Sequence, residues 1–217
     1  MRTATPAPRL WLSVAILLIV AGCQDATAPS SAPSMLGDAA RYPTTPAGVC
    51  VLRQSPTAPP LETYQVSFWA HVGKASTVAV NYAPTTDQSV GESFLRFDIP
   101  RSGLLTGAGG ARLGMNDSVR ITLTIDPVDF AVEFQPSGVL FSARSPAKLT
   151  LWYDNADLDF NGNGVVDGWD RRQLQRLGLW YRTDRTYSWF RSPSRNDATQ
   201  LIVMGSVFHF SEYAVSW

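Results

Sequence analysis

The chain has 217 residues, and its 18 basic and 18 acidic side chains give a formal net charge of +0 at pH 7. This balance excludes a strongly basic nucleic-acid-binding protein and an acidic solvating tail, so we expect no nucleic acid among its partners. The 15 Pro, 16 Gly and 11% aromatic residues are typical of a strand-rich globular protein rather than of a helical bundle or a disordered chain.

The chain begins with a short polar segment that contains two Arg, and an apolar run of 12 residues follows it (10–21, LWLSVAILLIVA). The run is too short for a membrane span, which needs roughly 18 or more apolar residues, and is typical of a secretory signal. Residues 20–23, Val-Ala-Gly-Cys, resemble the lipobox of bacterial lipoproteins. The resemblance implies a signal peptide over 1–22 and a membrane-lipid anchor on acylated Cys23.

This resemblance implies secretion across the inner membrane and anchoring in the bacterial cell envelope, in either the inner or the outer membrane. Two or more acyl chains on Cys23 would anchor the protein stably, whereas a single chain anchors only marginally. The alternative is an ordinary secreted protein with a chance Cys after its signal.

Residues 23–60 are rich in Pro, Ala, Ser and Thr and show no apolar periodicity. This composition predicts a semi-extended tether between the lipid anchor and a folded domain. With Cys23 lipidated, Cys50 has no other Cys to pair with, so the fold must be held by its apolar core.

From residue 61 onward, apolar and polar residues alternate with a period of two, as in strands with one buried face and one exposed face. Many short segments of this kind predict an all-β antiparallel sandwich over 61–217, and one helical stretch is expected at 169–177. The expected strands are 64–70, 78–82, 95–99, 119–125, 130–134, 149–153, 177–181, 187–190, 201–204, 207–210 and 213–217.

Five segments follow one another in a characteristic order: 94–100 (FLRFDIP), 117–125 (DSVRITLTI), 136–153 (PSGVLFSARSPAKLTLWY), 179–190 (LWYRTDRTYSWF) and 209–215 (HFSEYAV). From about residue 92, this order resembles the ZU5 domain, a β-sandwich of ankyrins, netrin receptors and tight-junction proteins. A generic immunoglobulin-like sandwich is the alternative. ZU5 domains mostly bind partners or brace neighbouring domains, so the resemblance implies a non-enzymatic protein with an unidentified protein or glycan partner.

An acidic insertion at 157–170 contains the spacing D-x-N-x-N-G-x-V-D-x-x-D, which fits an EF-hand or dockerin-type calcium loop. Calcium takes about six to eight oxygen ligands, and this spacing supplies side-chain oxygens at loop positions 1, 3, 5, 9 and 12 and a carbonyl at position 7. Gly164 permits the sharp turn, and Val166 is expected to pack the loop down. The predicted ligands of a structural Ca²⁺ ion are Asp159, Asn161, Asn163, Val165, Asp167 and Asp170.

Two alternatives for this loop remain open. One is an Asx-rich turn that binds no metal, because Asn, Asp and Gly are favoured in turns in any case. The other is a dockerin fragment that docks a cohesin, although dockerins generally carry two such loops.

The motif His209-Phe210-Ser211 resembles the self-cleavage site of some ZU5-containing signalling proteins. The resemblance implies that the Ser211 hydroxyl attacks the Phe210 carbonyl with help from His209. The simpler alternative, which we favour, is that the three residues only pack the last strands, so that the chain has no catalytic residues.

Seven Arg lie between residues 171 and 195, and Trp152, Trp180 and Trp189 lie in or near the same part of the sequence. These side chains suggest a carbohydrate- or surface-binding module. Solvation of the helix, protection of strand edges and filling of the core explain them more simply.

Overall fold

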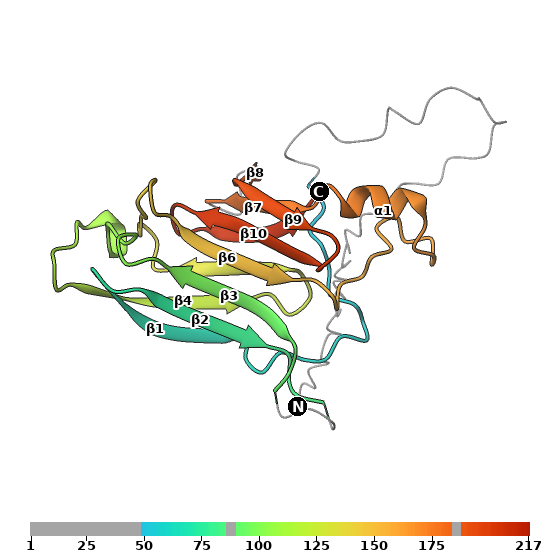
Figure 1. Cartoon of the computed structure of the whole chain (residues 1–217), viewed down its shortest axis with the longest axis horizontal. Helices are drawn as coiled ribbons and strands as arrows, with labels where there is room; N and C mark the ends of the chain where they lie inside the picture. The colour runs from blue at the N-terminus through green and yellow to red at the C-terminus, as the bar shows by residue number, and fades with distance from the viewer. Residues whose placement is uncertain (1–48, 86–89, 184–187) are drawn as a thin grey trace, which may run out of the picture. The chain divides into compact units, whose positions relative to one another are not determined.

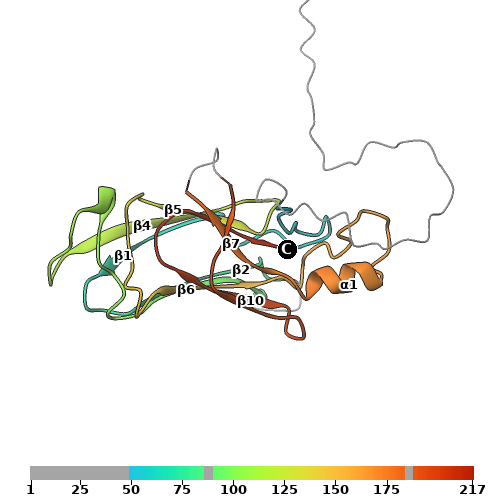
Figure 2. The ribbon, with the colours of Figure 1, turned by 90° about the horizontal axis from the view of Figure 1, so that it is seen from above.

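The computed structural model describes residues 49–85, 90–183 and 188–217 (Figure 1). These residues form two antiparallel β-sheets that pack face to face, with one short helix, α1 (Gly168–Leu174), at one end of the sandwich. Figure 2 shows the two sheets as separate layers, with β1, β4 and β5 in one layer and β2, β6 and β10 in the other. The predicted all-β sandwich with a single short helix is confirmed.

The six-stranded sheet has the order β1-β4-β5-β11-β7-β8, and the five-stranded sheet has the order β2-β3-β6-β10-β9. Neighbouring strands in both sheets run antiparallel. The strands are β1 (Gln65–His71), β2 (Ser76–Asn81), β3 (Ser93–Ile99), β4 (Ser118–Ile125), β5 (Ala131–Gln135), β6 (Ala147–Trp152), β7 (Gly178–Arg182), β8 (Phe190–Arg191), β9 (Ser194–Asp197), β10 (Ile202–Val207) and β11 (Glu212–Ser216).

Strand β4 shows why the period-two pattern forms this fold. Its apolar residues Val119, Ile121, Leu123 and Ile125 are all buried, whereas the side chains between them lie on the outer face of the sheet. Because successive side chains in a strand point to opposite faces, an alternating segment can place a full apolar row on the other sheet.

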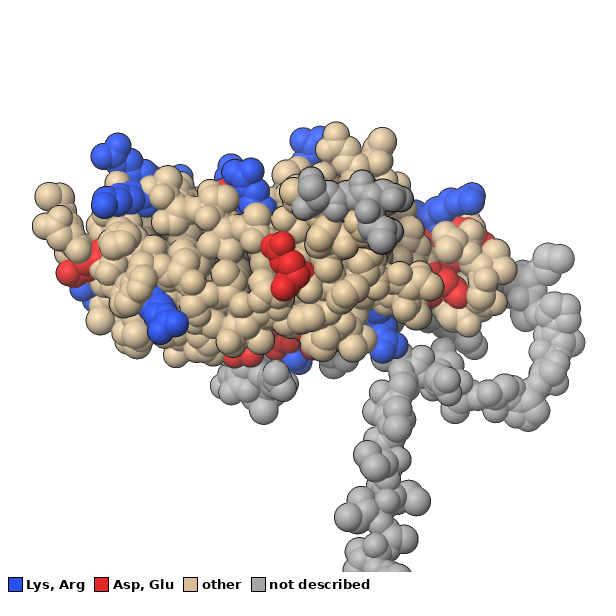
Figure 3. Space-filling view, turned by 90° about the horizontal axis from the view of Figure 1, so that it is seen from below, with Lys and Arg blue, Asp and Glu red and all other residues tan. Residues whose placement is uncertain are grey.

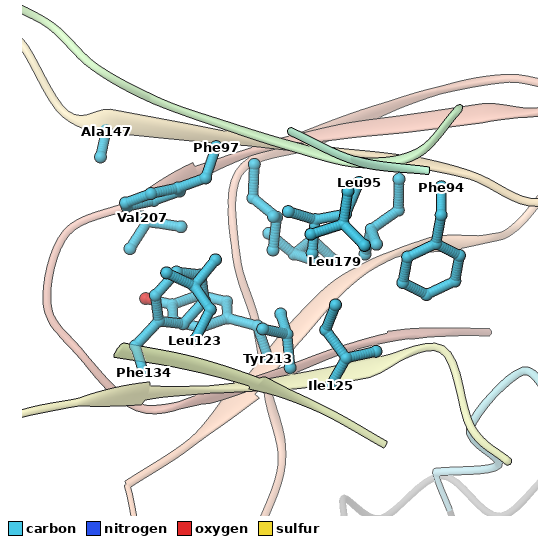
Figure 4. Packing of buried hydrophobic residues seen from close by; sticks show 14 of the residues in the cluster. Phe94, Leu95, Phe97, Leu123, Ile125, Phe134, Ala147, Leu179, Val207 and Tyr213 are labelled. Atoms are coloured by element: carbon cyan, nitrogen blue, oxygen red, sulfur yellow. The ribbon is translucent and has the colours of Figure 1, made fainter. Parts of the chain in front are cut away.

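Aromatic side chains from both sheets meet in the core. Phe97 of β3 and Phe134 of β5 have ring centroids 4.7 Å apart, and Phe134 stacks on Phe210 at 5.2 Å. Figure 4 shows Phe97 and Phe134 in the space between the two layers. Each fully buried side chain of this size stabilises the fold by about 1.5–3 kcal/mol, so this cluster ties the two sheets together.

The strand boundaries differ from the sequence prediction mainly after residue 190. The predicted strands 201–204 and 207–210 are one strand, β10, and residues 208–211 cross from the five-stranded sheet to the six-stranded one. Strand β9 was not predicted, because its sequence, Ser-Arg-Asn-Asp, lacks the apolar alternation of a half-buried strand. It lies at a sheet edge, where polar residues stay solvated.

The signal peptide 1–22, Cys23 and the tether up to residue 48 lie outside the described residues, whereas residues 49–60 pack on the sandwich. Leu52 is only 1% exposed, and its N–H donates to the Val215 carbonyl at 2.8 Å. The domain boundary predicted at residue 61 therefore lies inside the packed part of the chain. Sequence periodicity misses this segment because it forms isolated bridges rather than a strand.

Within the described ranges, no helix has the length and apolar character needed to cross a bilayer.

Substitution Leu52→Ala tests whether residues 49–60 belong to the folded domain. We expect the free energy of unfolding to fall by about 2–5 kcal/mol, because a buried apolar side chain is lost and a cavity remains. Chemical denaturation measures this change. Arg53→Ala is the control, since its side chain is 69% exposed and its ion pair with Asp129 is 3.7 Å long. We expect that substitution to change stability by less than about 1 kcal/mol. Equal stability of Leu52→Ala and the unsubstituted chain would show that this segment does not pack.

Candidate functional site

The acidic loop connects β6 to α1 and lies at the end of the sandwich that carries the helix (Figure 2). A strand, not a helix, precedes the loop, so the loop has an exiting helix alone. Its sequence forms tight turns because Gly162 and Gly164 adopt positive φ angles of 69° and 85°, which side chains other than Gly rarely allow.

The first half of the loop is organised around the Asp159 carboxylate. Asp159 Oδ2 accepts the Gly164 N–H at 2.6 Å, and Asp159 Oδ1 accepts the Asn163 N–H at 3.1 Å. The same Asn163 N–H also points to Asn161 Oδ1 at 2.9 Å. Because Asp159 Oδ1 and Asn161 Oδ1 share the Asn163 N–H, the side chains at loop positions 1 and 3 lie next to each other.

The second half of the loop is a capping box at the start of α1. Asp167 Oδ1 accepts the Trp169 N–H at 2.6 Å and the Asp170 N–H at 3.4 Å, and Asp170 Oδ2 accepts the Asp167 N–H at 2.8 Å. The pKa of Asp167 is lowered, chiefly by the hydrogen bond from the Trp169 N–H. The Asn163 side chain also contributes to this lowered pKa.

Asp170 closes the loop from inside the protein. Its side chain is fully buried, and its Oδ1 accepts the Phe160 N–H at 2.9 Å. The Asp170 carboxylate therefore accepts the N–H groups of both Phe160, at loop position 2, and Asp167, at loop position 9.

The donor set fits calcium in its chemistry. Three Asp and two Asn supply hard oxygen donors, and carboxylate oxygens that accept one N–H retain lone pairs for a cation. The backbone turns match the predicted frame, with Gly164 at the positive φ of position 6. Within the described part of the chain, however, no three or more His, Cys, Asp or Glu side chains gather as a metal-holding group. Val166 is 46% exposed, so the prediction that it packs the loop down is wrong.

The second candidate site is the crossing from β10 to β11. The Ser211 Oγ and the His209 Nδ1 are 2.8 Å apart, whereas the Phe210 side chain lies in the core. Tyr213 Oη donates to the His209 carbonyl at 2.9 Å, and burial raises the pKa of Tyr213, which keeps this phenol protonated. The structure therefore brings the predicted His and Ser together.

A cavity of about 230 Å³ adjoins this crossing and was not predicted. It is lined in part by Ser211, and by Glu133 of β5, Arg182 of β7 and Glu212 of β11. Arg182 binds the Glu212 carboxylate through two hydrogen bonds of 2.7 and 2.9 Å. The three charged residues are far apart in sequence and become neighbours only through the strand order, so no local pattern reveals them.

The three Trp that suggested a carbohydrate- or surface-binding module are largely covered. Trp189 is 9% exposed and lies under the Arg182 guanidinium, 4.6 Å from its ring centroid. Trp180 is half-buried and its Nε1 donates to the Ser216 carbonyl at 3.2 Å, and Trp152 is also half-buried. Trp69, which lies outside that part of the sequence, is 59% exposed.

No family model, curated protein or solved structure gives a significant match to the chain. The resemblances to ZU5 domains, to lipoprotein signals and to calcium loops therefore stay predictions from the motifs.

Substitution Asp170→Ala tests the role of this carboxylate in the calcium-free loop. We expect a loss of about 1–3 kcal/mol in the free energy of unfolding, because the N–H groups of Phe160 and Asp167 lose their acceptor. Urea denaturation in the presence of a chelator measures the loss. Arg171→Ala, an exposed position on the same helix, is the control and should change stability by less than about 0.5 kcal/mol. Equal effects of the two substitutions would contradict this role.

Proposed function

We propose that the protein is a non-enzymatic, lipid-anchored module of the bacterial cell envelope that binds a partner or braces neighbouring structures. The proposal combines a ZU5-like β-sandwich with a lipid anchor on Cys23 and a structural calcium ion in the loop 157–170. The observation that carries it is the loop itself, in which the Asp159 carboxylate receives the N–H groups of Asn163 and Gly164 in the calcium-loop frame.

The calcium ion would be held by side-chain oxygens of Asp159, Asn161, Asn163, Asp167 and Asp170 and by the Val165 carbonyl. It would supply positive charge among three carboxylates and hold the exposed turn at 161–166 in place. An affinity in the extracellular range, with Kd of about 10⁻⁴–10⁻³ M, is sufficient outside the cell.

A fixed loop matters to the sandwich because the loop contacts the C-terminal strand. Phe160 donates its N–H to Asp170 at 2.9 Å, and its ring packs on Trp217 with centroids 4.6 Å apart. Trp217 directly follows β11, which lies in the middle of the six-stranded sheet. Calcium would therefore support the sheet as well as the loop.

Calcium titration of residues 24–217 by calorimetry, with thermal melting alongside, tests this proposal. We expect one binding event and a raised melting temperature, since calcium at ten times its Kd stabilises the folded state by about 1.4 kcal/mol. Asp159→Ala should lose both effects. Asp157→Asn, an acidic position just outside the frame, should keep both. No heat and no shift in melting up to several millimolar calcium would contradict the proposal.

Self-cleavage at Phe210–Ser211 is a second candidate function, favoured by the 2.8 Å contact between Ser211 Oγ and His209 Nδ1. In this reaction Ser211 Oγ bonds to the Phe210 carbonyl carbon while His209 takes the hydroxyl proton. The C–N bond then breaks, the Ser211 nitrogen takes the proton, and water hydrolyses the resulting ester. The product segment 211–217 contains the whole of β11.

Intact-mass analysis under denaturing conditions distinguishes the two functions. Denaturation is needed because β11 pairs with strands on both sides and would keep a cut segment in place. The primary proposal predicts a single uncut chain. Two masses that match a cut after residue 210, and that disappear in Ser211→Ala, would support self-cleavage instead. A cut that persists in Ser211→Ala would indicate a contaminating protease.

A further inference from the structure

Strand β1 forms an open edge of the sandwich. It ends the six-stranded sheet, and among the described residues it pairs with β4 alone. Figure 1 shows it at the lower margin of the molecule, beside β2. Its seven residues, QVSFWAH, include no Asp, Glu, Lys, Arg, Pro or Gly. Natural proteins usually protect such an edge with charges, Pro, bulges or a very short strand.

Two of the other three sheet edges have these protections. Strand β8 has two residues, one of them Arg191, and β9 has four, including Arg195, with Pro193 just before it. Strand β2 has no charge, Pro or Gly, and its register shifts only at its last residue, Asn81. Among the described residues, β1 is the longest of the four edge strands, with seven residues. Figure 3 views the molecule from below and shows Lys, Arg, Asp and Glu side chains at separate places on this face, with uncharged surface between them.

Two hydrogen bonds determine which backbone groups of β1 face this edge. The Ile125 N–H donates to the Tyr64 carbonyl at 2.8 Å, and the Val72 N–H donates to the Asp117 carbonyl at 3.0 Å. Antiparallel partners alternate between hydrogen-bonded and non-hydrogen-bonded pairs, so the even-numbered residues from 64 to 72 exchange hydrogen bonds with the other strand. The N–H and C=O groups of Gln65, Ser67, Trp69 and His71 therefore point away from β4. The two Gln65 groups bond to the Thr63 hydroxyl, and the His71 carbonyl accepts the Lys74 N–H. The backbone groups of Ser67 and Trp69 and the His71 N–H are left for another strand.

We propose that β1 is a self-association surface, on which the β1 strand of a second copy of this chain pairs antiparallel about a two-fold axis at Phe68. In this register Gln65 lies opposite His71, and Ser67 lies opposite Trp69. The two Ser67–Trp69 pairs, one on each side of the axis, use backbone groups that face the open edge, whereas the outer Gln65–His71 pairs are partly engaged within the chain by Thr63 and Lys74. The interface is isologous, and two six-stranded sheets become one continuous sheet.

The side chains of β1 are self-complementary in the same register. On the core side, half-buried Val66 lies opposite buried Ala70, and half-buried Phe68 lies opposite its own copy. On the outer face, Trp69, which is 59% exposed, lies opposite the small side chain of Ser67. The pairing sets no like charges of β1 against each other, and it covers an exposed Trp that no described segment covers.

Disulfide trapping in the full chain, kept in the membranes of the expressing cells, tests this register. Phe68→Cys places two Cys in a non-hydrogen-bonded pair at the axis, with Cα atoms about 4.5 Å apart, which suits a disulfide. We expect a cross-linked dimer on a non-reducing gel after mild oxidation. Val66→Cys is the matched control, because its two copies would be about 13 Å apart along the strands and cannot be bridged. The unsubstituted chain gives the background from Cys23 and Cys50.

A second substitution tests whether the backbone pairing carries the contact. Ser67→Pro removes an N–H that points to the partner and leaves the backbone hydrogen bonds to β4 in place. It also removes the 2.7 Å hydrogen bond between the Ser67 and Thr122 hydroxyls, which Ser67→Ala removes as well. Added to Phe68→Cys, it should abolish the cross-link, whereas Ser67→Ala should retain it. A cross-link of equal yield in both double variants would overturn the proposal.

If Phe68→Cys fails to melt cooperatively, co-expressed Ser67→Cys and Trp69→Cys chains replace it, since both positions are exposed. The proposal then predicts a dimer when both chains are present and none when either is expressed alone. In folded chains, a yield of cross-linked dimer no higher than that of Val66→Cys would overturn self-association. A cross-link to a different protein would overturn it in favour of a foreign strand on the same edge.

Discussion

The position of β11 is the constraint on which the rest of the structure depends. This strand lies between β5 and β7, so it joins β1, β4 and β5 to β7 and β8 in one sheet. Its Tyr213 and Val215 are part of the buried core, and the carbonyl of Val215 receives the N–H of Leu52 from the N-terminal side of the domain. Segments from three distant parts of the sequence therefore become neighbours only when this strand is in place.

Both candidate sites are connected to this strand. The His209–Phe210–Ser211 crossing leads directly into β11, and the acidic loop reaches its other end through the contact between Phe160 and Trp217. The same strand would thus be stabilised by calcium in one proposal and cut from the chain in the other. A module that works by binding needs a rigid scaffold. The packing of Phe210 in the core therefore agrees better with stabilisation of β11 by calcium than with self-cleavage beside Phe210.

The sequence predicts those features that depend on local spacing. Alternation locates the buried faces of β1, β3, β4 and β6, and the spacing of Asp and Asn locates the turn around Gly164. Strand order depends on contacts between distant residues, so the cavity between Glu133, Arg182 and Glu212 has no local signature. The packing of Leu52 was missed because the apolar run at 49–52 is too short to show a period, and β9 was missed because edge strands tolerate polar sequences.

Hydrogen–deuterium exchange with and without calcium is the most informative measurement, because it locates any stabilisation along the chain. We expect slower exchange in residues 157–177 when calcium is present, a smaller effect in β11, and no change in β1 to β4. This pattern should disappear in Asp159→Ala. Unchanged exchange in the loop at millimolar calcium, or equal protection of every strand, would show that calcium does not brace the loop and β11.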